Sequence, residues 1–494
     1  RNDVQLETRI GFQVDAPIDS FTLSRDSFFV TDSDGLRVEG ELSLDDEDPS
    51  IAIFRADEPL RIITDFTATI TTELESVGGA TLAEDYDWSF RTIDSAWGLS
   101  EWLESTGTGR SDGQQVVVDA QSNAIAVWEF TTTLSGSNPP TGIWSSRYTR
   151  VDLWGRREQI DAGDGGALNP ALAVDGAGNA FAVWEEWNRD GGRFEANTWA
   201  NRYVVDQGWG TPERIQEGVL PSLKPKVAAD SDGNPIAIWI EQEFPSNLQR
   251  IRFRRYDMDT GWGENETIDS TPNSSAPVTT DVQMDGAGNA IAMWTLRTLT
   301  MQGGSGDVLW ANRYVAGEGW ETARLIKSDP ETRAQGARLG LSANGEAHVV
   351  WVQYVDNPAN ETRRDIWAVR YAPGSNWDST DWTVPERIDD YDAQSKAAPD
   401  IAVDGMGVAH AAWTQEDRKL QNDFLNIYAN RYTVESGWET PVLVEPPTLD
   451  PREDANATAP RVGVNAAGNT FVVWRQDWQD WGSIWSNRID PGED

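Results

Sequence analysis

Two histidines, His348 and His410, are the only ones in the chain, and each stands three residues before a tryptophan, Trp351 or Trp413. An imidazole titrates near neutral pH, so a pair could act as general acid and base or as metal ligands. Five similar segments carry an apolar residue at the same place: Ile125, Phe181, Ile236, Ile291 and Phe471. An apolar mid-strand position favours a buried histidine packed between sheets, and the paired acid/base or metal site is the alternative.

A second candidate for chemistry is the segment Asp230-Ser-Asp232-Gly-Asn234. Asp and Asn offer the oxygen ligands that calcium takes, so Asp230 and Asp232 are candidate metal ligands. No complete loop with alternating acidic ligands and a terminal Glu follows, and Gly and Asn also suit a tight hairpin. A plain turn is therefore favoured, and no cofactor is expected unless calcium binds here.

The richest group of polar and aromatic residues follows a tryptophan that recurs along the chain. Five segments place Glu or Gln two residues after it: Glu186, Glu241, Gln353, Gln415 and Gln476. Further candidates are nearby in sequence: Trp187, Arg189, Tyr354, Trp478 and Trp481. Aromatic faces stack on the C–H faces of sugars, while amides and carboxylates pair with hydroxyl groups. We expect these ten residues to form a ligand-binding surface, the alternative being that they only cap the ends of strands.

The recurring tryptophan belongs to an internal repeat with the pattern Ala-Val-Asp-Gly-Ala-Gly-Asn-Ala-Phe-Ala-Val-Trp. Seven copies end at Trp128, Trp184, Trp239, Trp294, Trp351, Trp413 and Trp474. Each copy is typical of four short strands, with a Gly/Asn turn between the first two and Gly-Trp opening the fourth. Such a small sheet cannot bury both faces without neighbours, so the repeat predicts propeller blades.

The two ends of the array support this prediction. The last copy stops after its third strand, and an unpaired Gly-Trp-type strand precedes the first copy at residues 96–103. Pairing of these two segments would complete the last blade and close the ring. The third strand of every copy also carries an arginine: Arg147, Arg202, Arg255, Arg313, Arg370, Arg431 and Arg488. Seven equivalent copies favour a repeated ion pair or stacking contact over a sialidase-type arginine triad.

Over residues 96 to 494 the repeat resembles bacterial seven-bladed propellers of secreted and surface proteins. Residues 1–94 lack the repeat and contain short alternating strands separated by turns, which predicts a β-sandwich. Phe12, Ala16-Pro17-Ile18-Asp19, Glu58-Pro59-Leu60 and the closing Trp88-Ser-Phe-Arg-Thr92 resemble bacterial Ig-like domains of surface proteins. The expected fold is thus all-β, with an Ig-like β-sandwich over 1–94 and a seven-bladed β-propeller, closed by an N-terminal strand, over 95–494.

Composition limits the partners. The net charge is −41 and there is no cysteine, which excludes thiolate chemistry and disfavours binding to nucleic acid or anionic membranes. The chain starts at Arg1 and has no apolar run long enough to span a bilayer, so we expect an exported protein whose signal peptide has been removed. The expected location is extracellular or on the cell surface, with the periplasm as an alternative.

No nucleophile elbow, P-loop, zinc spacing or dinucleotide fingerprint is present in the sequence. The favoured function is a non-catalytic binding protein that recognises a glycan or a protein through the variable propeller face. A polysaccharide lyase or glycoside hydrolase with its site on the same face is the first alternative. A structural component of a surface assembly is the second.

Overall fold

A computed structural model describes residues 2–4, 10–32, 35–45, 48–56, 65–92, 101–103, 109–132, 141–149, 153–163, 166–190, 193–243, 246, 248–268, 277–299, 305–327, 333–356, 362–372, 377–389, 399–416, 425–444, 456–478 and 481–489. Within these ranges the chain is all-β, with a single short 3-10 helix. It forms two compact units, one containing residues 1–96 and one formed by Trp97–Arg488.

The first unit is a sandwich of two sheets. One sheet has the order β1-β7-β6-β3 and the other the order β2-β5-β4. Their bounds are β1 (Asn2–Val4), β2 (Ile10–Gln13), β3 (Phe28–Thr31), β4 (Gly40–Leu44), β5 (Ile51–Ala56), β6 (Asp65–Ile70) and β7 (Tyr86–Thr92). Alternate residues point inward, as in β5, where Ala52 and Phe54 are buried. The core is aromatic, and Phe28 makes an edge contact with Phe12 at 4.8 Å and stacks on Trp88 at 6.0 Å.

The second unit repeats one antiparallel pattern, in which each of the seven sequence copies supplies three long strands. The first strands are β9 (Gly109–Val118), β14 (Gly166–Val174), β19 (Ser222–Ala229), β24 (Pro277–Met284), β29 (Ala334–Leu341), β33 (Asp400–Val403) and β38 (Asn456–Val464). The second strands are β10 (Ala124–Thr132), β15 (Ala180–Asp190), β20 (Pro235–Gln242), β25 (Ala290–Leu299), β30 (Ala347–Asp356), β34 (Ala409–Glu416) and β39 (Thr470–Trp478). The third strands are β11 (Thr141–Thr149), β16 (Arg193–Val204), β21 (Gln249–Asp257), β26 (Ser305–Val315), β31 (Thr362–Tyr371), β35 (Leu425–Thr433) and β40 (Trp481–Ile489).

Short outer pieces pair with the third strands. They are β12 (Leu153–Trp154), β13 (Glu158–Gln159), β17 (Gly208–Trp209), β18 (Glu213–Arg214), β22 (Gly261–Trp262), β23 (Glu266–Thr267), β27 (Gly319–Trp320), β28 (Arg324–Lys327), β32 (Glu386–Arg387), β36 (Gly437–Trp438) and β37 (Val442–Leu443). The 3-10 helix η1 (Ser379–Asp381) precedes β32. The Gly-Trp positions therefore begin the outer edge of the sheet in four of the copies, and Leu153–Trp154 takes this place in the first.

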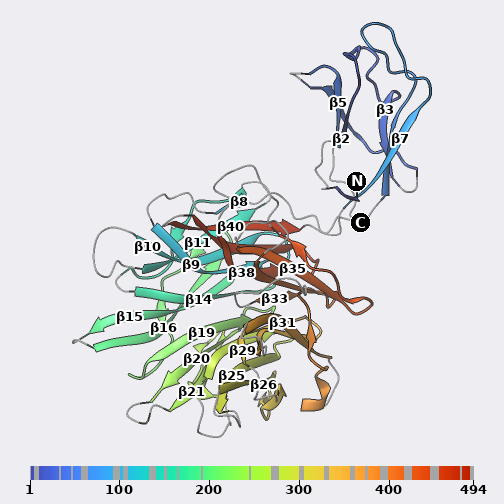
Figure 1. Cartoon of the computed structure of the whole chain (residues 1–494). Coiled ribbons are helices and arrows are strands. Elements are labelled where there is room, and N and C mark those ends of the chain that lie inside the picture. Colours follow the sequence, from blue (N-terminus) through green and yellow to red (C-terminus); the bar gives the residue numbers. More distant parts are fainter. Residues whose placement is uncertain are drawn as a thin grey trace. The chain divides into compact units, whose positions relative to one another are not determined.

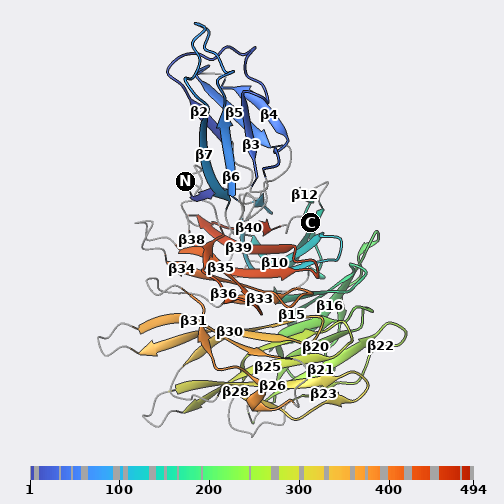
Figure 2. The same ribbon diagram turned by 90° about the vertical axis from the view of Figure 1, so that its right-hand side faces the viewer.

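The last copy takes its outer strand from the segment before the first copy, as the sequence predicted. β8 (Glu101–Trp102) pairs antiparallel with β40, with Trp102 opposite Trp485. β40 also makes one parallel bridge to β9, so the first and last copies belong to one nine-stranded sheet. Both ribbon views place the cyan strands of the first copy beside the red strands of the last (Figures 1 and 2).

The tryptophans that end the second-strand pattern are the centre of the packing. All seven are at most 1% exposed, which confirms that they are structural. The third-strand arginines join neighbouring copies. Arg255 Nη1 donates to the Tyr314 hydroxyl at 3.1 Å, Arg313 Nη1 donates to Tyr371 at 3.3 Å, and the Arg488 guanidinium lies 5.2 Å from the ring centroid of Tyr148. Arg255 and Arg313 also form ion pairs with Asp230 and Glu321, so the predicted ion-pair or stacking role is confirmed for these three arginines.

The first strands face inward. Residues from all seven of them line one cavity of about 210 Å³ in the second unit. Along the cavity wall, each first strand contacts the first strand of the next copy, and β38 contacts β9.

Candidate functional site

Four of the five predicted amide and carboxylate ligands serve the core instead. Glu186 accepts a hydrogen bond from the Trp184 indole N–H at 2.8 Å. Gln353, Gln415 and Gln476 accept the same bond from Trp351, Trp413 and Trp474 at 2.8–2.9 Å. All four are at most 6% exposed, so their alternation with the tryptophan reflects a repeated buried hydrogen bond, and their predicted ligand-binding role stays a prediction.

The fifth member, Glu241, is also buried and pairs with Arg252 Nε at 2.9 Å. The hydroxyl of Tyr354 donates to Gln335 at 2.8 Å, and its ring lies between the guanidinium groups of Arg333 and Arg364, at 5.2 and 5.1 Å. These contacts orient Tyr354 from within its own copy and leave it half-buried. The side chains of Arg189, Trp478 and Trp481 lie outside the described part of the chain, so their predicted roles stay predictions.

The two histidines have separate surroundings. His348 is 1% exposed, its Nε2 lies 3.1 Å from Glu346 Oε1, and its ring packs 4.9 Å from that of Tyr432. Burial lowers the pKa of His348, although Glu346 opposes this effect. His410 Nδ1 lies 3.4 Å from the Thr470 hydroxyl. His348 therefore fits the predicted packing of a buried histidine between sheets, whereas His410 is only partly buried, and neither has the other among its described contacts.

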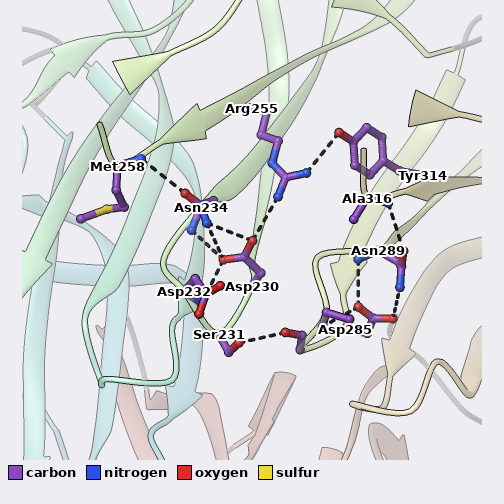
Figure 3. Close-up of polar contacts among 12 residues, drawn as sticks. Asp230, Ser231, Asp232, Asn234, Arg255, Met258, Asp285, Asn289, Tyr314 and Ala316 are labelled. Carbon is purple, nitrogen blue, oxygen red and sulfur yellow. Dashed lines mark hydrogen bonds and ion pairs between the residues drawn. The ribbon is translucent and has the colours of Figure 1, made fainter. Parts of the chain in front are cut away.

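In the acidic turns at Asp230 and Asp285, the aspartate carboxylate accepts hydrogen bonds from residues of its own turn (Figure 3). Asp230 Oδ1 accepts the backbone N–H groups of Asp232 and Asn234, and Asp230 Oδ2 accepts Arg255 Nη2 at 3.1 Å. Asp285 repeats the pattern with Asn289. The Asp230 carboxylate is therefore engaged as a turn acceptor. Among the described residues no group of three or more acidic or histidine side chains is placed to hold a metal, and calcium binding at Asp230 and Asp232 stays a prediction.

A cluster of polar residues, most of which were not among the candidates predicted from the sequence, lies where the first and second copies meet. Glu129 and Glu185 each stand one residue after the recurring tryptophan, within strands β10 and β15. The Asn169 backbone N–H donates to Glu129 Oε1 at 2.6 Å, and the Asn169 side-chain amide donates to Glu185 Oε1 at 2.9 Å. One residue thus holds two carboxylates.

Two more residues complete this cluster. The Trp187 indole N–H donates to Glu185 Oε2 at 3.1 Å, and the Lys224 backbone N–H donates to Glu185 Oε1 at 2.5 Å. Asn169 and Lys224 are exposed, whereas Glu129 and Trp187 are half-buried. We call Glu129, Asn169, Glu185, Trp187 and Lys224 the Glu129 site. Of these five residues only Trp187 was among the predicted ligand-binding residues.

A bulge in the first strands aims these N–H groups. Asn169 and Lys224 have φ of 54° and 53°, the left-handed region that costs a non-glycine residue about 1 kcal/mol. The ladder register shifts at both residues, between Leu168 and Ala171 and between Leu223 and Lys226. Each bulge is followed by a proline, which lacks the N–H that a regular ladder needs. The strained backbone therefore turns this N–H toward a carboxylate of the preceding copy.

The electrostatics of the Glu129 site favour a proton. Burial raises the pKa of Glu129 to about 7, opposed by the Asn169 N–H and assisted by the negative charges of Asp112 and Glu185. Burial also raises the pKa of Glu185, against the hydrogen bonds from Lys224, Trp187 and Asn169. Near neutral pH this cluster can therefore donate a hydrogen bond from a protonated carboxyl group and accept one at a carboxylate.

Comparison with known proteins bears on each unit. Residues 1–92 match the family of bacterial Ig-like domains. No curated protein matches the chain.

Solved structures that resemble the chain do so at low sequence identity. An ulvan lyase of a new polysaccharide lyase family is similar with a TM-score of 0.51 and 8% identity, over 78% of this chain and 94% of its own. A second ulvan lyase structure, bound to a saccharide of glucuronic acid and sulfated rhamnose, has a TM-score of 0.52 and 8% identity, over 79% of this chain and 95% of its own. An α-L-arabinanase of Penicillium chrysogenum complexed with arabinobiose has a TM-score of 0.43 and 11% identity, over 66% and 93%. At these identities the likeness is one of fold, that of a propeller.

Within the described ranges, no helix has the length and apolar character needed to cross a bilayer.

Proposed function

We propose that the protein is a non-catalytic glycan-recognition protein that binds through the Glu129 site. The observation that carries the proposal is the double hydrogen bond of Asn169, which fixes two carboxylates beside the Trp187 indole. A carboxylate next to an aromatic ring can accept sugar hydroxyl hydrogen bonds while the ring packs on the C–H face. The exposed Asn169 and Lys224 add donors at the rim.

For the fold we propose a single closed propeller with seven blades. Three contacts between the last copy and the first support this proposal. β8 pairs with β40, the Arg488 guanidinium stacks on Tyr148, and Asn465 Nδ2 donates to the Asp119 carbonyl at 3.0 Å. In this arrangement the Glu129 site lies on the face that carries the long connections between second and third strands.

A glycan-cleaving enzyme is the second candidate function, and one observation favours it. The pKa of Glu129 is raised to about 7, which would keep a carboxylic acid protonated near neutral pH. Glycoside hydrolases use such an acid to protonate the leaving oxygen, with a second carboxylate as base or nucleophile. Glu185 would be that second carboxylate. The solved structures of similar fold that act on polysaccharides agree with a glycan ligand for either function.

We further propose that the protein works outside the cell, where the Ig-like domain serves as a spacer. The match of residues 1–92 to bacterial Ig-like domains supports this location. A net charge of −41 suits a neutral or cationic ligand, or one met in high salt, better than a densely anionic one in dilute buffer.

The experiment is a binding screen of the full chain on neutral, uronic-acid and sulfated polysaccharides, with and without calcium. Reducing ends and unsaturated products are measured in the same samples. Binding without product release supports recognition, whereas product release supports the enzyme. If neither binding nor product release is detected, both proposed functions are contradicted. A protein ligand or a structural role in a surface assembly would then remain.

A further inference from the structure

The cavity at the centre of the second unit carries an uneven set of charges. In every copy, the residue of the first strand that pairs with the position just before the recurring tryptophan lies on the cavity wall. In chain order these residues are Gln115, Ala171, Lys226, Asp281, Arg338, Asp400 and Arg461. Because they share one register, they form a single layer, which we call the central ring.

The two carboxylates of the central ring are occupied by neighbouring strands. Asp281 Oδ2 accepts the Leu339 backbone N–H at 3.0 Å, and Asp400 Oδ2 accepts the Val462 backbone N–H at 2.8 Å. Asp400 Oδ1 also lies 3.4 Å from Arg338 Nε. Each aspartate thus joins its own first strand to that of the following copy, which gives it a structural reason to be there.

Two of the three cations of the central ring, Lys226 and Arg461, are less well paired. No hydrogen bond or ion pair of the Lys226 ammonium is found among the described residues. Arg461 donates Nη1 to its neighbouring Pro460 carbonyl, while its buried Nε has no partner within the described chain. Burial lowers the pKa of Lys226 to about 7, assisted by Arg338 and Arg461 and opposed by Asp281 and Asp400. The ring therefore has three cations for two carboxylates, in a chain that is otherwise strongly acidic.

We propose that this cavity is a binding site for a small oxyanion, held by Lys226, Arg338 and Arg461. An oxyanion would supply the acceptors that Lys226 and Arg461 lack, with Arg338 beside them, and guanidinium groups match the geometry of sulfate, phosphate and carboxylate oxygens. The cavity of about 210 Å³ is far larger than the ~10–15 Å³ that one water needs. The proposal does not depend on the Glu129 site, because the two share no residue.

Anion binding at the central ring should be coupled to the protonation of Lys226. Lys226 binds an anion only when it is charged, and Arg338, Arg461, Asp281 and Asp400 are the other charged groups of the ring that face it. An anion raises the pKa of Lys226, so its binding takes up a proton at alkaline pH. The pKa of Lys226 is about 7 in the anion-free protein. The affinity for the anion should therefore fall by up to tenfold for each pH unit above this value.

The test is calorimetric titration of the full chain with sodium sulfate, sodium phosphate and sodium acetate at constant ionic strength. The variants are Lys226→Gln and, as a control with the same loss of charge, the exposed Arg214→Gln. Saturable binding that weakens about tenfold to hundredfold in Lys226→Gln, but not in Arg214→Gln, is expected. Preference for acetate would indicate the carboxylate of an organic acid, and preference for sulfate or phosphate an inorganic anion.

Two outcomes overturn the proposal: no saturable binding of any of the three anions, or equal affinity in both variants, which indicates an adventitious ion only. If Lys226→Gln fails to fold, the wild-type protein decides. Crystals soaked in sodium selenate should show an anomalous peak inside the central ring, and selenate found only on the outer surface contradicts the site.

Discussion

The backbone N–H of Asn169 donates a 2.6 Å hydrogen bond to Glu129 Oε1 and so ties the first strand of the second copy to the second strand of the first. The same relationship recurs between Lys224 and Glu185, and the Thr414 hydroxyl takes the carboxylate's place toward Ala459. The bond is thus part of the way copies join. In the first two copies, however, the acceptor is an ionisable group that carries the site's chemistry.

Glu129 should make stability depend on pH near neutrality. Its pKa is about 7 in the folded chain and that of an ordinary glutamate when unfolded, so the folded state binds more protons between these values. The free energy of unfolding should therefore fall as the pH rises through this window, and Glu129→Gln should flatten the decline. Urea unfolding between about pH 5 and pH 8 measures it. The exposed Glu158→Gln is the control, and an equal slope in Glu129→Gln and wild type contradicts the raised pKa.

Gln415 should matter to stability and not to ligand binding. Gln415→Leu leaves the buried Trp413 indole N–H without its 2.9 Å acceptor, which should cost about 1–3 kcal/mol of unfolding free energy. Chemical denaturation gives this value, and glycan affinity of the folded variant should equal that of wild type. Lost affinity with intact stability would restore Gln415 to the ligand-binding surface.

His348 should behave as a packing residue. Since burial lowers its pKa, the unfolded state takes up a proton before the folded state does, and the contribution of His348 to stability should decline as pH falls below about 6.5, opposite in sign to that of Glu129. His348→Phe, which places there the residue found at Phe181 and Phe471, should remove this acid sensitivity and keep ligand binding. Thermal melts at acid and neutral pH, together with the glycan assay, measure both. Abolished product release in a folded His348→Phe protein would instead make His348 catalytic.

Arg488 should stabilise the junction between the last copy and the first. Arg488→Ala removes its stacking on Tyr148 and should cost about 1–2 kcal/mol, because the contact is partly shielded from water. Unfolding monitored by tryptophan fluorescence gives the cost, and limited proteolysis should cut first next to β8 or β40. The exposed Arg25→Ala, in the first unit, is the control. An unchanged midpoint and cleavage pattern would contradict a closed ring.

The repeat could be read from the sequence because each of its features is local and recurs. The buried tryptophans and the third-strand arginines follow from positions within one copy, and the pairing of β8 with β40 follows from the missing fourth strand of the last copy. The hydrogen bonds of Glu186 and the glutamines could not be predicted, because their partner, an indole two residues earlier, comes within reach only when the strand is folded.

The Glu129 site was harder to predict, because it depends on contacts between copies. Glu129 and Glu185 owe their raised pKa values to burial and to N–H groups of the following copy. Two signals were nevertheless present. The residue after the tryptophan is Glu only in the first two copies, and Asn169-Pro170 and Lys224-Pro225 interrupt otherwise regular strands where a bulge is expected.

The most direct test of the account is calorimetric titration of the best polysaccharide from the screen into wild type, Trp187→Ala and the exposed Phe21→Ala. We predict that Trp187→Ala weakens binding about threefold to tenfold, the loss expected for one aromatic contact, while Phe21→Ala binds as wild type does. Equal affinity of Trp187→Ala and wild type, in a folded protein, would contradict glycan recognition at the Glu129 site.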